Sequence, residues 1–402
     1  MEERKLKSKI DNSFLKLKSY CEAENYKGWD PYDGMNSKVF QALPFKHWDL
    51  ARLAWIQGFK RSPINFRKLL LVPKEHNAKG VALFLLGYCK LYQLAQSGCE
   101  DFGTKEALFN KVKEVTSLLL SLRSKGYSGS CWGYNFDWQA RRLFLFEKHT
   151  PTVVATCFSV EALLESYEIT KDNSVLKETL SAADFVTQDL SRTQRDKGII
   201  FSYSIKDGNN TVINASLLGA KILSYSYKYT KNQDHADLAK QAVLAACDLQ
   251  EVDGSWVYGL LPIQSWKDSF HTGFNLDAIE TYQQNTGDFT FQINIQKGTD
   301  YYLEHFFEAN GMPKYYHNKT FPIDIHCPAQ VIVTLSKLNV SKENEALLTK
   351  ILDWTVSNMQ HKNGYFYYQL KKGMSSKISY MRWSNAFMFN AMSHYLLEKK
   401  SK

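Results

Sequence analysis

The chain has 402 residues, of which 44% are hydrophobic and 23% are charged, as is ordinary for a soluble globular protein. Its net charge is +9, but Lys and Arg are spread along the chain, and no basic block is dense enough to indicate a nucleic-acid partner. The positive excess instead favours an acidic partner, such as a uronate-bearing glycan or a lipid phosphate.

The N-terminal sequence MEERKLKSKIDNSFLKL is charged and lacks the apolar stretch of a signal peptide. No window approaches the ~20 consecutive apolar residues of a transmembrane segment. The seven cysteines show no CxxC spacing, and several lie in apolar helical runs, so we expect buried free thiols. These features together predict a cytoplasmic protein.

The chain begins with a predicted short amphipathic helix at residues 5–20, and we expect residues 1–24 to be a helical extension of a single domain that spans residues 1–402. From residue 80 onwards, mostly apolar helices alternate with amphipathic ones. The apolar helices are predicted at residues 80–95, 152–167, 215–229, 273–284, 328–338 and 385–397. The amphipathic helices are predicted at residues 107–122, 173–190, 234–250, 291–307 and 344–359.

A turn pattern of glycine followed by aromatic residues recurs between these helix pairs. The recurrences are marked by Trp29, Trp132, Phe201, Trp256, Tyr315 and Phe366. Beyond the first interval they lie roughly 50 to 70 residues apart, which indicates a helical repeat. The pattern predicts an all-α (α/α)6 toroid with short strands at residues 199–204 and 365–370 on its loop face, with an open α-solenoid as the alternative. Closure is favoured because the inner helices are apolar on most faces.

The loops that lead from outer to inner helices carry most of the aromatic side chains. Loops on a rigid scaffold usually hold the functional site, and aromatic clefts bind the apolar faces of sugar rings. We therefore predict a glycan-binding cleft, although the same aromatic residues would also serve to plug the barrel mouth. The predicted substrate-binding residues are Trp132, Tyr134, Trp256, Tyr258, Trp266, Lys267, Tyr315, Tyr367, Arg382 and Trp383.

Two Asp-His pairs stand directly before predicted inner helices, and they are the main catalytic candidates. Asp268 and His271 occur in SWKDSFHTG, and Asp324 and His326 occur in FPIDIHCPAQ. Equivalent placement in adjacent repeats would direct both pairs into one cavity, where a histidine beside a carboxylate is suited to acid/base catalysis. In the alternative interpretation, each Asp caps its helix or holds its loop.

Two further side chains are open to two interpretations each. Asp137, in YNFDWQARR, is either an acid/base carboxylate or the partner of Arg141 or Arg142. Arg382 suits bidentate binding of a uronate or phosphate, or neutralises Asp324 inside the ring.

The motifs of several large enzyme classes are missing. The chain lacks a GxGxxG after a strand, a P-loop, a GxSxG and an HExxH, so we expect no cofactor and no metal. A terpene- or prenyl-type toroid enzyme is disfavoured because there is no Asp-rich diphosphate motif.

The motifs DGSWVYG…QSWKDSFHTGF, PKYYHN…PIDIHCPAQ and NGYFYYQ…YMRWSNAFMF resemble a family of bacterial proteins encoded in capsule, O-antigen and exopolysaccharide clusters. The resemblance runs from about Asn25 to the C-terminus, and it implies a six-hairpin glycosidase-like toroid and a role in polysaccharide synthesis. There is also a fold-level likeness to the toroidal domain of glucuronyl C5-epimerases, where the start of the last helix is similar to Arg382-Trp383.

The leading hypothesis is a carbohydrate-active enzyme of surface-polysaccharide synthesis that acts on an acidic or lipid-linked oligosaccharide. Its chemistry would be that of an epimerase, a lyase or a glycosidase. The alternative is a non-catalytic glycan-binding or scaffold protein of the same pathway. Whether the two Asp-His pairs face one cavity distinguishes these hypotheses.

Overall fold

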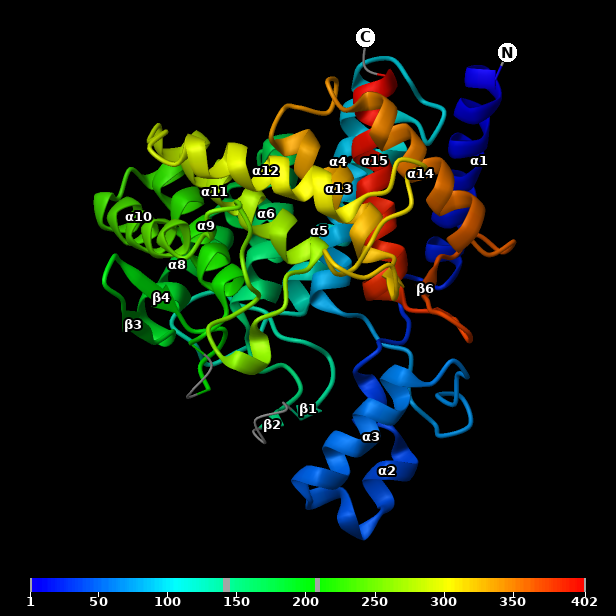
Figure 1. The fold of residues 1–402 in the computed structure, drawn as a ribbon, viewed down its shortest axis with the longest axis horizontal. Coiled ribbons are helices and arrows are strands. Elements are labelled where there is room, and N and C mark those ends of the chain that lie inside the picture. Colours follow the sequence, from blue (N-terminus) through cyan, green and yellow to red (C-terminus); the bar gives the residue numbers. More distant parts are fainter. Residues whose placement is uncertain (1, 140–144, 207–209, 401–402) are drawn as a thin grey trace.

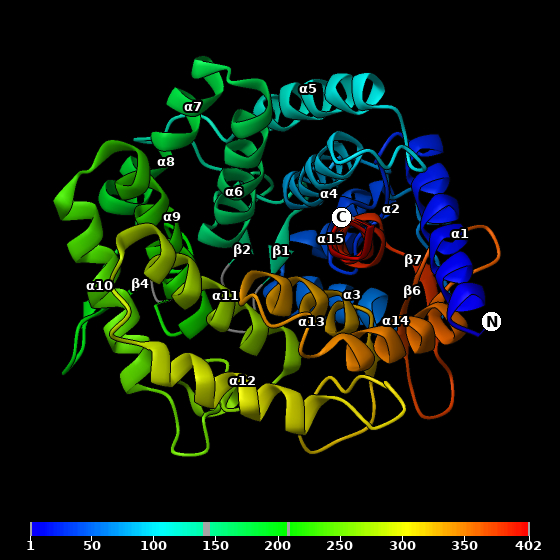
Figure 2. The same ribbon diagram turned by 90° about the horizontal axis from the view of Figure 1, so that it is seen from above.

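The computed structural model describes residues 2–139, 145–206 and 210–400. Its helices form two concentric rings, which are seen end-on in Figure 2. The inner helices are α4 (Ala78–Gln96), α6 (Val153–Thr170), α9 (Ile213–Thr230), α11 (Ser269–Thr286), α13 (His326–Lys337) and α15 (Phe387–Lys400). The outer helices are α1 (Glu2–Ala23), α5 (Lys105–Ser121), α7 (Asn173–Leu180) with α8 (Ala182–Asp184), α10 (Gln233–Asp248), α12 (Gln292–Phe306) and α14 (Glu345–Met359).

The inner ring is closed. Helix α15, the last of the chain, packs against α4 as α4 packs against α6, and each inner helix contacts the next around the ring. Such a helix has neighbours on nearly every side, which explains why its sequence is apolar almost all round. The predicted (α/α)6 toroid is confirmed, and the open solenoid is excluded.

Helix α1 completes the outer ring. It packs against α14 and α15, Lys9 forms an ion pair with Asp353 of α14, and Gln360 donates a hydrogen bond to the Ser13 carbonyl at 3.0 Å. Residues 1–24, predicted as a helical extension, contain α1, which lies in the outer ring beside α14. The spacing of apolar residues predicts a helix, but it does not predict which other helices that helix packs against.

The recurring glycines explain how each repeat joins the next. Gly311 and Gly364 have φ values of +87° and +101°, a region that favours glycine. A Cβ on Gly311 would lie 2.5 Å from the carbonyl oxygen of Lys350 in α14, and one on Gly364 would lie 2.2 Å from that of Lys16 in α1. Each turn thus presses its backbone against an outer helix, and α1 takes the same place as α14.

The short strands lie at the loop end of the barrel (Figure 1). They pair in antiparallel fashion: β1 (Trp138–Gln139) with β2 (Leu145–Phe146), β3 (Arg192–Gln194) with β4 (Ile199–Phe201), and β5 (Ile323–Asp324) with β6 (Tyr367–Leu370) and β7 (Ser376–Ser379). Two π-helical turns, η3 (Phe185–Asp189) and η5 (Met381–Ala386), follow α8 and precede α15. A further turn, η4, spans Pro262–Gln264. The strands hold the loops that surround the barrel mouth.

A lobe formed by residues 33–72 projects from the loop end, away from both chain termini (Figure 1). It contains η1 (Asp33–Asn36), α2 (Lys38–Ala42), η2 (Pro44–His47) and α3 (Asp49–Arg61). Its small core consists of Met35, Phe40 and Ile56. The fully buried Arg67 pairs with Asp33 within the lobe at 2.7 Å, and it joins the lobe to the barrel by lying over the Tyr380 ring.

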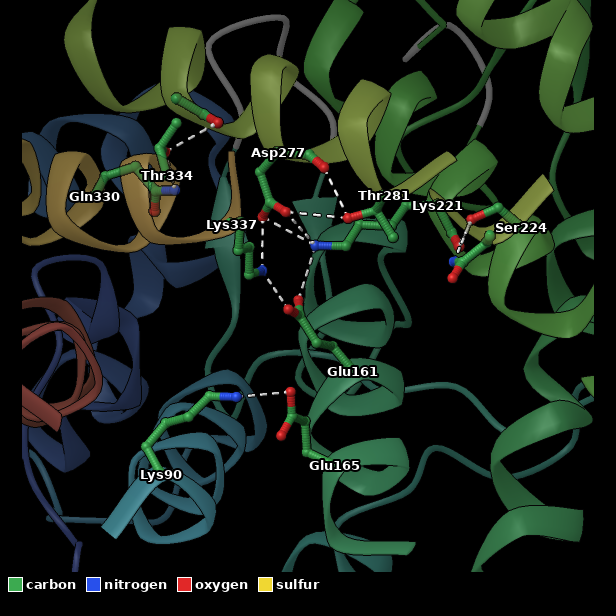
Figure 3. A network of polar contacts seen from close by, with 12 residues as sticks. Lys90, Glu161, Glu165, Lys221, Ser224, Asp277, Thr281, Gln330, Thr334 and Lys337 are labelled. Carbon is green, nitrogen blue, oxygen red and sulfur yellow. Dashed lines mark hydrogen bonds and ion pairs between the residues drawn. The ribbon is translucent and has the colours of Figure 1, made fainter. Parts of the chain in front are cut away.

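A buried charge network ties the inner helices together (Figure 3). Lys221 of α9 lies 2.9 Å from both Glu161 of α6 and Asp277 of α11, and Lys337 of α13 contacts the same two carboxylates. Burial opposes ionisation, but Lys221 and Lys337 nevertheless hold the pKa of Glu161 well below its ordinary value. The network thus links four inner helices by two cations and two anions.

Candidate active site

A cavity of about 370 Å³ opens at the loop end, where the inner helices begin. Side chains from the first residues of successive inner helices and of η5 line it: Lys79, Val154, Asn214, His271, His326 and Arg382. Helix N-termini carry partial positive charge, so their convergence favours an anionic group in the cavity.

The walls of the cavity are mostly aromatic. Tyr258 and Trp266 stack with ring centroids 4.6 Å apart, and Tyr134 stacks on Phe136 at 5.4 Å. Further aromatic lining comes from Tyr32, Trp138, Phe146, Tyr203, Phe270, Phe274, Tyr315, Tyr316 and Trp383. Such walls suit the apolar faces of sugar rings.

The first Asp-His pair is joined by a hydrogen bond. His271 Nδ1 lies 2.7 Å from Asp268 Oδ2, and Asp268 Oδ1 also accepts the His271 backbone N–H at 3.0 Å as the cap of α11. Trp266 Nε1 donates to the same carboxylate at 2.9 Å. Because a carboxylate accepts, Nδ1 carries a proton and Nε2 is left to exchange a proton with a ligand.

The second pair has nearly the same scaffold. Asp324 accepts the His326 backbone N–H at 3.0 Å and the indole N–H of Trp383 at 3.0 Å, and Gln369 donates to it at 2.6 Å. His326 Nδ1 lies 3.7 Å from Asp324 Oδ1, beyond hydrogen-bond distance. Burial lowers the pKa of His326 to about 4, so its imidazole is neutral at neutral pH.

Both imidazoles contact one aromatic ring in the same cavity. The Phe270 centroid lies 4.2 Å from that of His271 and 4.8 Å from that of His326. The carboxylates of Asp268 and Asp324 are buried behind them and do not line the cavity. The predicted pairs thus bring their histidines to a common space, while each Asp also performs the anchoring role that was the alternative.

Arg382 lines the cavity, but its charge is already balanced. Its Nε and one terminal nitrogen reach the two oxygens of Asp30 at 2.5 and 2.8 Å, and both side chains are buried. Sequence analysis named Asp324 as the possible internal partner, whereas the structure pairs Arg382 with a residue 352 positions away.

Lys79 is the main cavity residue that sequence analysis missed. Its Nζ lies 4.2, 5.1 and 4.9 Å from the ring centroids of Phe158, Phe274 and Phe387, and among described residues it has no carboxylate partner. Burial, together with Arg382, lowers its pKa well below the ordinary value. The available signal was a lysine in the first turn of an apolar helix that contains no Asp or Glu.

Several polar groups were also missed. Lys60 of the lobe reaches into the cavity wall, where its Nζ lies 2.5 Å from the Tyr32 hydroxyl. Asn214 Oδ1 and Gln139 Nε2 line the cavity and, within the described part of the chain, are buried without a hydrogen-bond partner.

Other predicted residues lie elsewhere. Trp132 and Trp256 are buried in the core and donate their indole N–H groups to the carbonyls of Leu119 and Ala246 at 2.9 Å, so they plug the repeats rather than line the cavity. Lys267 forms ion pairs with Glu251 and Asp253 outside the cavity, and Tyr367 of β6 packs near the rings of His361 and Tyr365.

Asp137 lies in the loop before β1 and accepts the Lys148 backbone N–H at 2.7 Å. Arg141 and Arg142, its predicted alternative partners, lie outside the described residues. Among those that are described, no Asp or Glu lines the cavity, and no cluster of three or more His, Cys, Asp or Glu side chains is placed to bind a metal ion.

No family model matches the chain, and no curated protein matches it in sequence. Solved structures share its fold. A sugar epimerase from a ruminal bacterium has a TM-score of 0.58 at 12% identity, over 82% of this chain and 90% of its own. Cellobiose 2-epimerase from Bacillus thermoamylovorans has 0.60 at 12%, over 82% and 90%. An unsaturated glucuronyl hydrolase specific for heparin has 0.60 at 14%, over 98% of both chains.

These likenesses define the class to which the fold belongs. The chain has the fold of an (α/α)6 toroid, and the three similar structures are two epimerases and a hydrolase. At these identities the comparison shows the fold, and the chemistry must be argued from the cavity itself.

Proposed function

We propose that the protein is an enzyme that moves a proton at a carbon of a saccharide bound in the loop-end cavity. The observation that carries this proposal is the placement of His271 and His326, from the starts of successive inner helices, in one cavity where both contact Phe270. Two positioned imidazoles allow one to remove a proton while the other returns it.

The roles follow from the contacts of each imidazole. His271 exchanges a proton through Nε2, since Asp268 holds Nδ1–H and stabilises the imidazolium that forms. His326 is neutral at physiological pH, so it acts as the base that removes the proton, and His271 in its imidazolium form acts as the acid that returns one. Cleavage by a pair of carboxylates is disfavoured, because that reaction needs two Asp or Glu side chains beside the bond, and none of the described cavity residues supplies one.

An acidic saccharide is the substrate class that the charges favour. Lys60 and Lys79, which have no carboxylate partner among the described residues, line the cavity together with the helix N-termini, and the described lining contributes no negative side chain. The motifs quoted above further support a role in surface-polysaccharide synthesis, with a lipid-linked oligosaccharide as one form of the substrate. All seven cysteines are free, in keeping with a cytoplasmic location.

The proposal is tested by incubating the protein with neutral and uronate-containing oligosaccharides and separating the products by chromatography with mass detection. An isomer of unchanged mass indicates epimerisation, and an unsaturated uronate indicates elimination; either product must vanish in His271→Ala. Binding without conversion would instead favour a glycan-binding or scaffold protein. Hydrolysis that survives His271→Ala and His326→Ala would contradict the assigned chemistry.

A further inference from the structure

The lobe of residues 33–72 holds a large share of the positive charge of the chain. It contains seven Lys or Arg and two Asp, an excess of five of the nine net positive charges in about a tenth of the length. Both Asp are already paired, Asp33 with Arg67 and Asp49 with Arg52. The impression from sequence that basic residues are evenly spread is thus wrong for this segment.

The remaining cations face solvent at several places on the lobe. Lys38, Arg61 and Lys68 are exposed and have no carboxylate partner among the described residues. Lys371 of the β6–β7 hairpin donates to the Arg61 carbonyl at 3.4 Å, which brings a further lysine to the same region. The surface of the lobe therefore carries positive charges that no described carboxylate neutralises.

Large apolar side chains are exposed on the same lobe. Trp48 and Leu50, where α3 begins, are 68% and 72% exposed. A second group follows α3: Ile64, Phe66, Leu69 and Leu71, exposed by 59%, 40%, 75% and 55%. Single exposed apolar residues are normal, but such a grouping on one projecting element indicates an interaction surface.

The neighbouring hairpin repeats this combination. Lys372 and Met374 are exposed between β6 and β7, Met374 by 69%, and Lys371 connects this turn to the end of α3. In Figure 1 the lobe stands clear of the helical ring, at the end opposite to both termini. Its surface is therefore accessible to a large, flat partner.

We propose that this lobe docks the protein on the surface of an anionic lipid bilayer. Lys and Arg are attracted to acidic headgroups, while Trp and Leu side chains enter the boundary between headgroups and acyl chains. A nucleic acid would use the cations and leave the aliphatic side chains without a partner. The described helices include none that is long and apolar enough to cross a bilayer, and this docking requires none.

Docking of the lobe also concerns the cavity. Helix α3 supplies Gln57 and Lys60 to the cavity wall, so the docked lobe holds the cavity close to the membrane surface. A saccharide attached to a lipid can then enter the cavity while its lipid remains in the bilayer. The docking itself does not depend on the proposed chemistry and is measured without a substrate.

The test is co-sedimentation of the full chain with vesicles of phosphatidylcholine alone or mixed with phosphatidylglycerol. We expect binding to the anionic vesicles that weakens as salt is added. The double variants W48S/L50S and L69S/L71S should each reduce binding. Replacing Arg61 and Lys68 by Gln should lower the partition coefficient about fivefold for each charge removed.

The matched control is V252S/I293S, which removes two side chains that are 97% and 70% exposed elsewhere on the molecule. It should bind as the unchanged protein does, and all variants should unfold at the same urea concentration. The proposal is overturned if the unchanged protein does not sediment with anionic vesicles, or if the lobe variants bind as the control does. It is also overturned if the lobe variants abolish self-association or RNA binding instead.

Discussion

A substitution at Asp268 can distinguish its role as the cap of α11 from its proposed role in catalysis. Asn at this position still caps α11, because a side-chain oxygen accepts the His271 backbone N–H, but its amide group no longer serves as the charged acceptor for Nδ1–H. We expect Asp268→Asn to retain the fold and to lower turnover by about a hundredfold or more, with a smaller change in substrate affinity.

Asp172→Asn is the matched control, because Asp172 caps α7 in the same way on the exposed surface. The measurement is the rate of proton exchange at the substrate carbon, with urea unfolding as the check on stability. Equal rates for Asp268→Asn and Asp172→Asn would mean that Asp268 serves α11 alone.

Lys79 predicts a pH dependence of ligand binding. Without a bound ligand, the pKa of the Lys79 amine lies well below its ordinary value, so the amine loses its proton easily. A bound carboxylate favours the charged amine and therefore raises this pKa. Binding of a uronate should therefore take up a proton, and its affinity should increase as the pH falls. Lys79→Met should remove the proton uptake and weaken uronate binding about tenfold or more.

Calorimetry of the same titration in buffers of different ionisation enthalpy measures this uptake directly. The corresponding neutral sugar is the control and should show neither the uptake nor the loss of affinity. If uronate binding by Lys79→Met keeps the affinity and proton count of the unchanged protein, Lys79 does not contact the anionic group.

At the scale of elements, Gly364 tests how α1 is held in the ring. Gly364→Ala introduces both an unfavourable φ and a Cβ 2.2 Å from the Lys16 carbonyl oxygen, so α1 must move away. Gly373→Ala introduces a similar φ of +94° but meets no atom within 4 Å. We expect Gly373→Ala to cost about 1–2 kcal/mol of unfolding free energy and Gly364→Ala clearly more. Equal losses in urea unfolding would show that α1 does not depend on this contact.

The charge network predicts a large effect from a single buried lysine. Lys221→Met leaves Glu161 and Asp277 with Lys337 as their remaining cation, and breaking a buried pair typically costs ~3–5 kcal/mol. Lys171→Met removes an exposed ion pair with Glu168 and should change the unfolding free energy by at most ~1 kcal/mol. Urea unfolding compares the two variants, and similar losses would contradict the structural role assigned to the network.

At the scale of the whole molecule, the sequence was sufficient to predict the toroid but only part of the site. The spacing of apolar residues indicates which helices are buried on most sides and which on one side. The Asp-His pattern at the start of α11 and α13 can be read from a few consecutive residues. The aromatic-turn pattern could not distinguish core residues such as Trp132 from cavity residues such as Trp266. Both residues follow a turn, and both pack against other side chains. The ion pair of Arg382 with Asp30 joins opposite ends of the chain and leaves no local signal.

The lobe was missed for a related reason. Residues 33–72 form short elements without a sustained period, and their charge excess is hidden in the average over the chain. The exposure of its cations and apolar side chains becomes evident only in the folded chain, where the lobe projects from the barrel.

The central claim is that two histidines in one cavity move a proton at a sugar carbon. The most direct measurement is NMR of uronate-containing oligosaccharides incubated with the protein in deuterated water. We predict deuterium at a single sugar carbon, lost in both His271→Ala and His326→Ala while ligand binding persists. Exchange that survives in both variants, or ligand binding by the unchanged protein with no exchange at any carbon, would contradict the account.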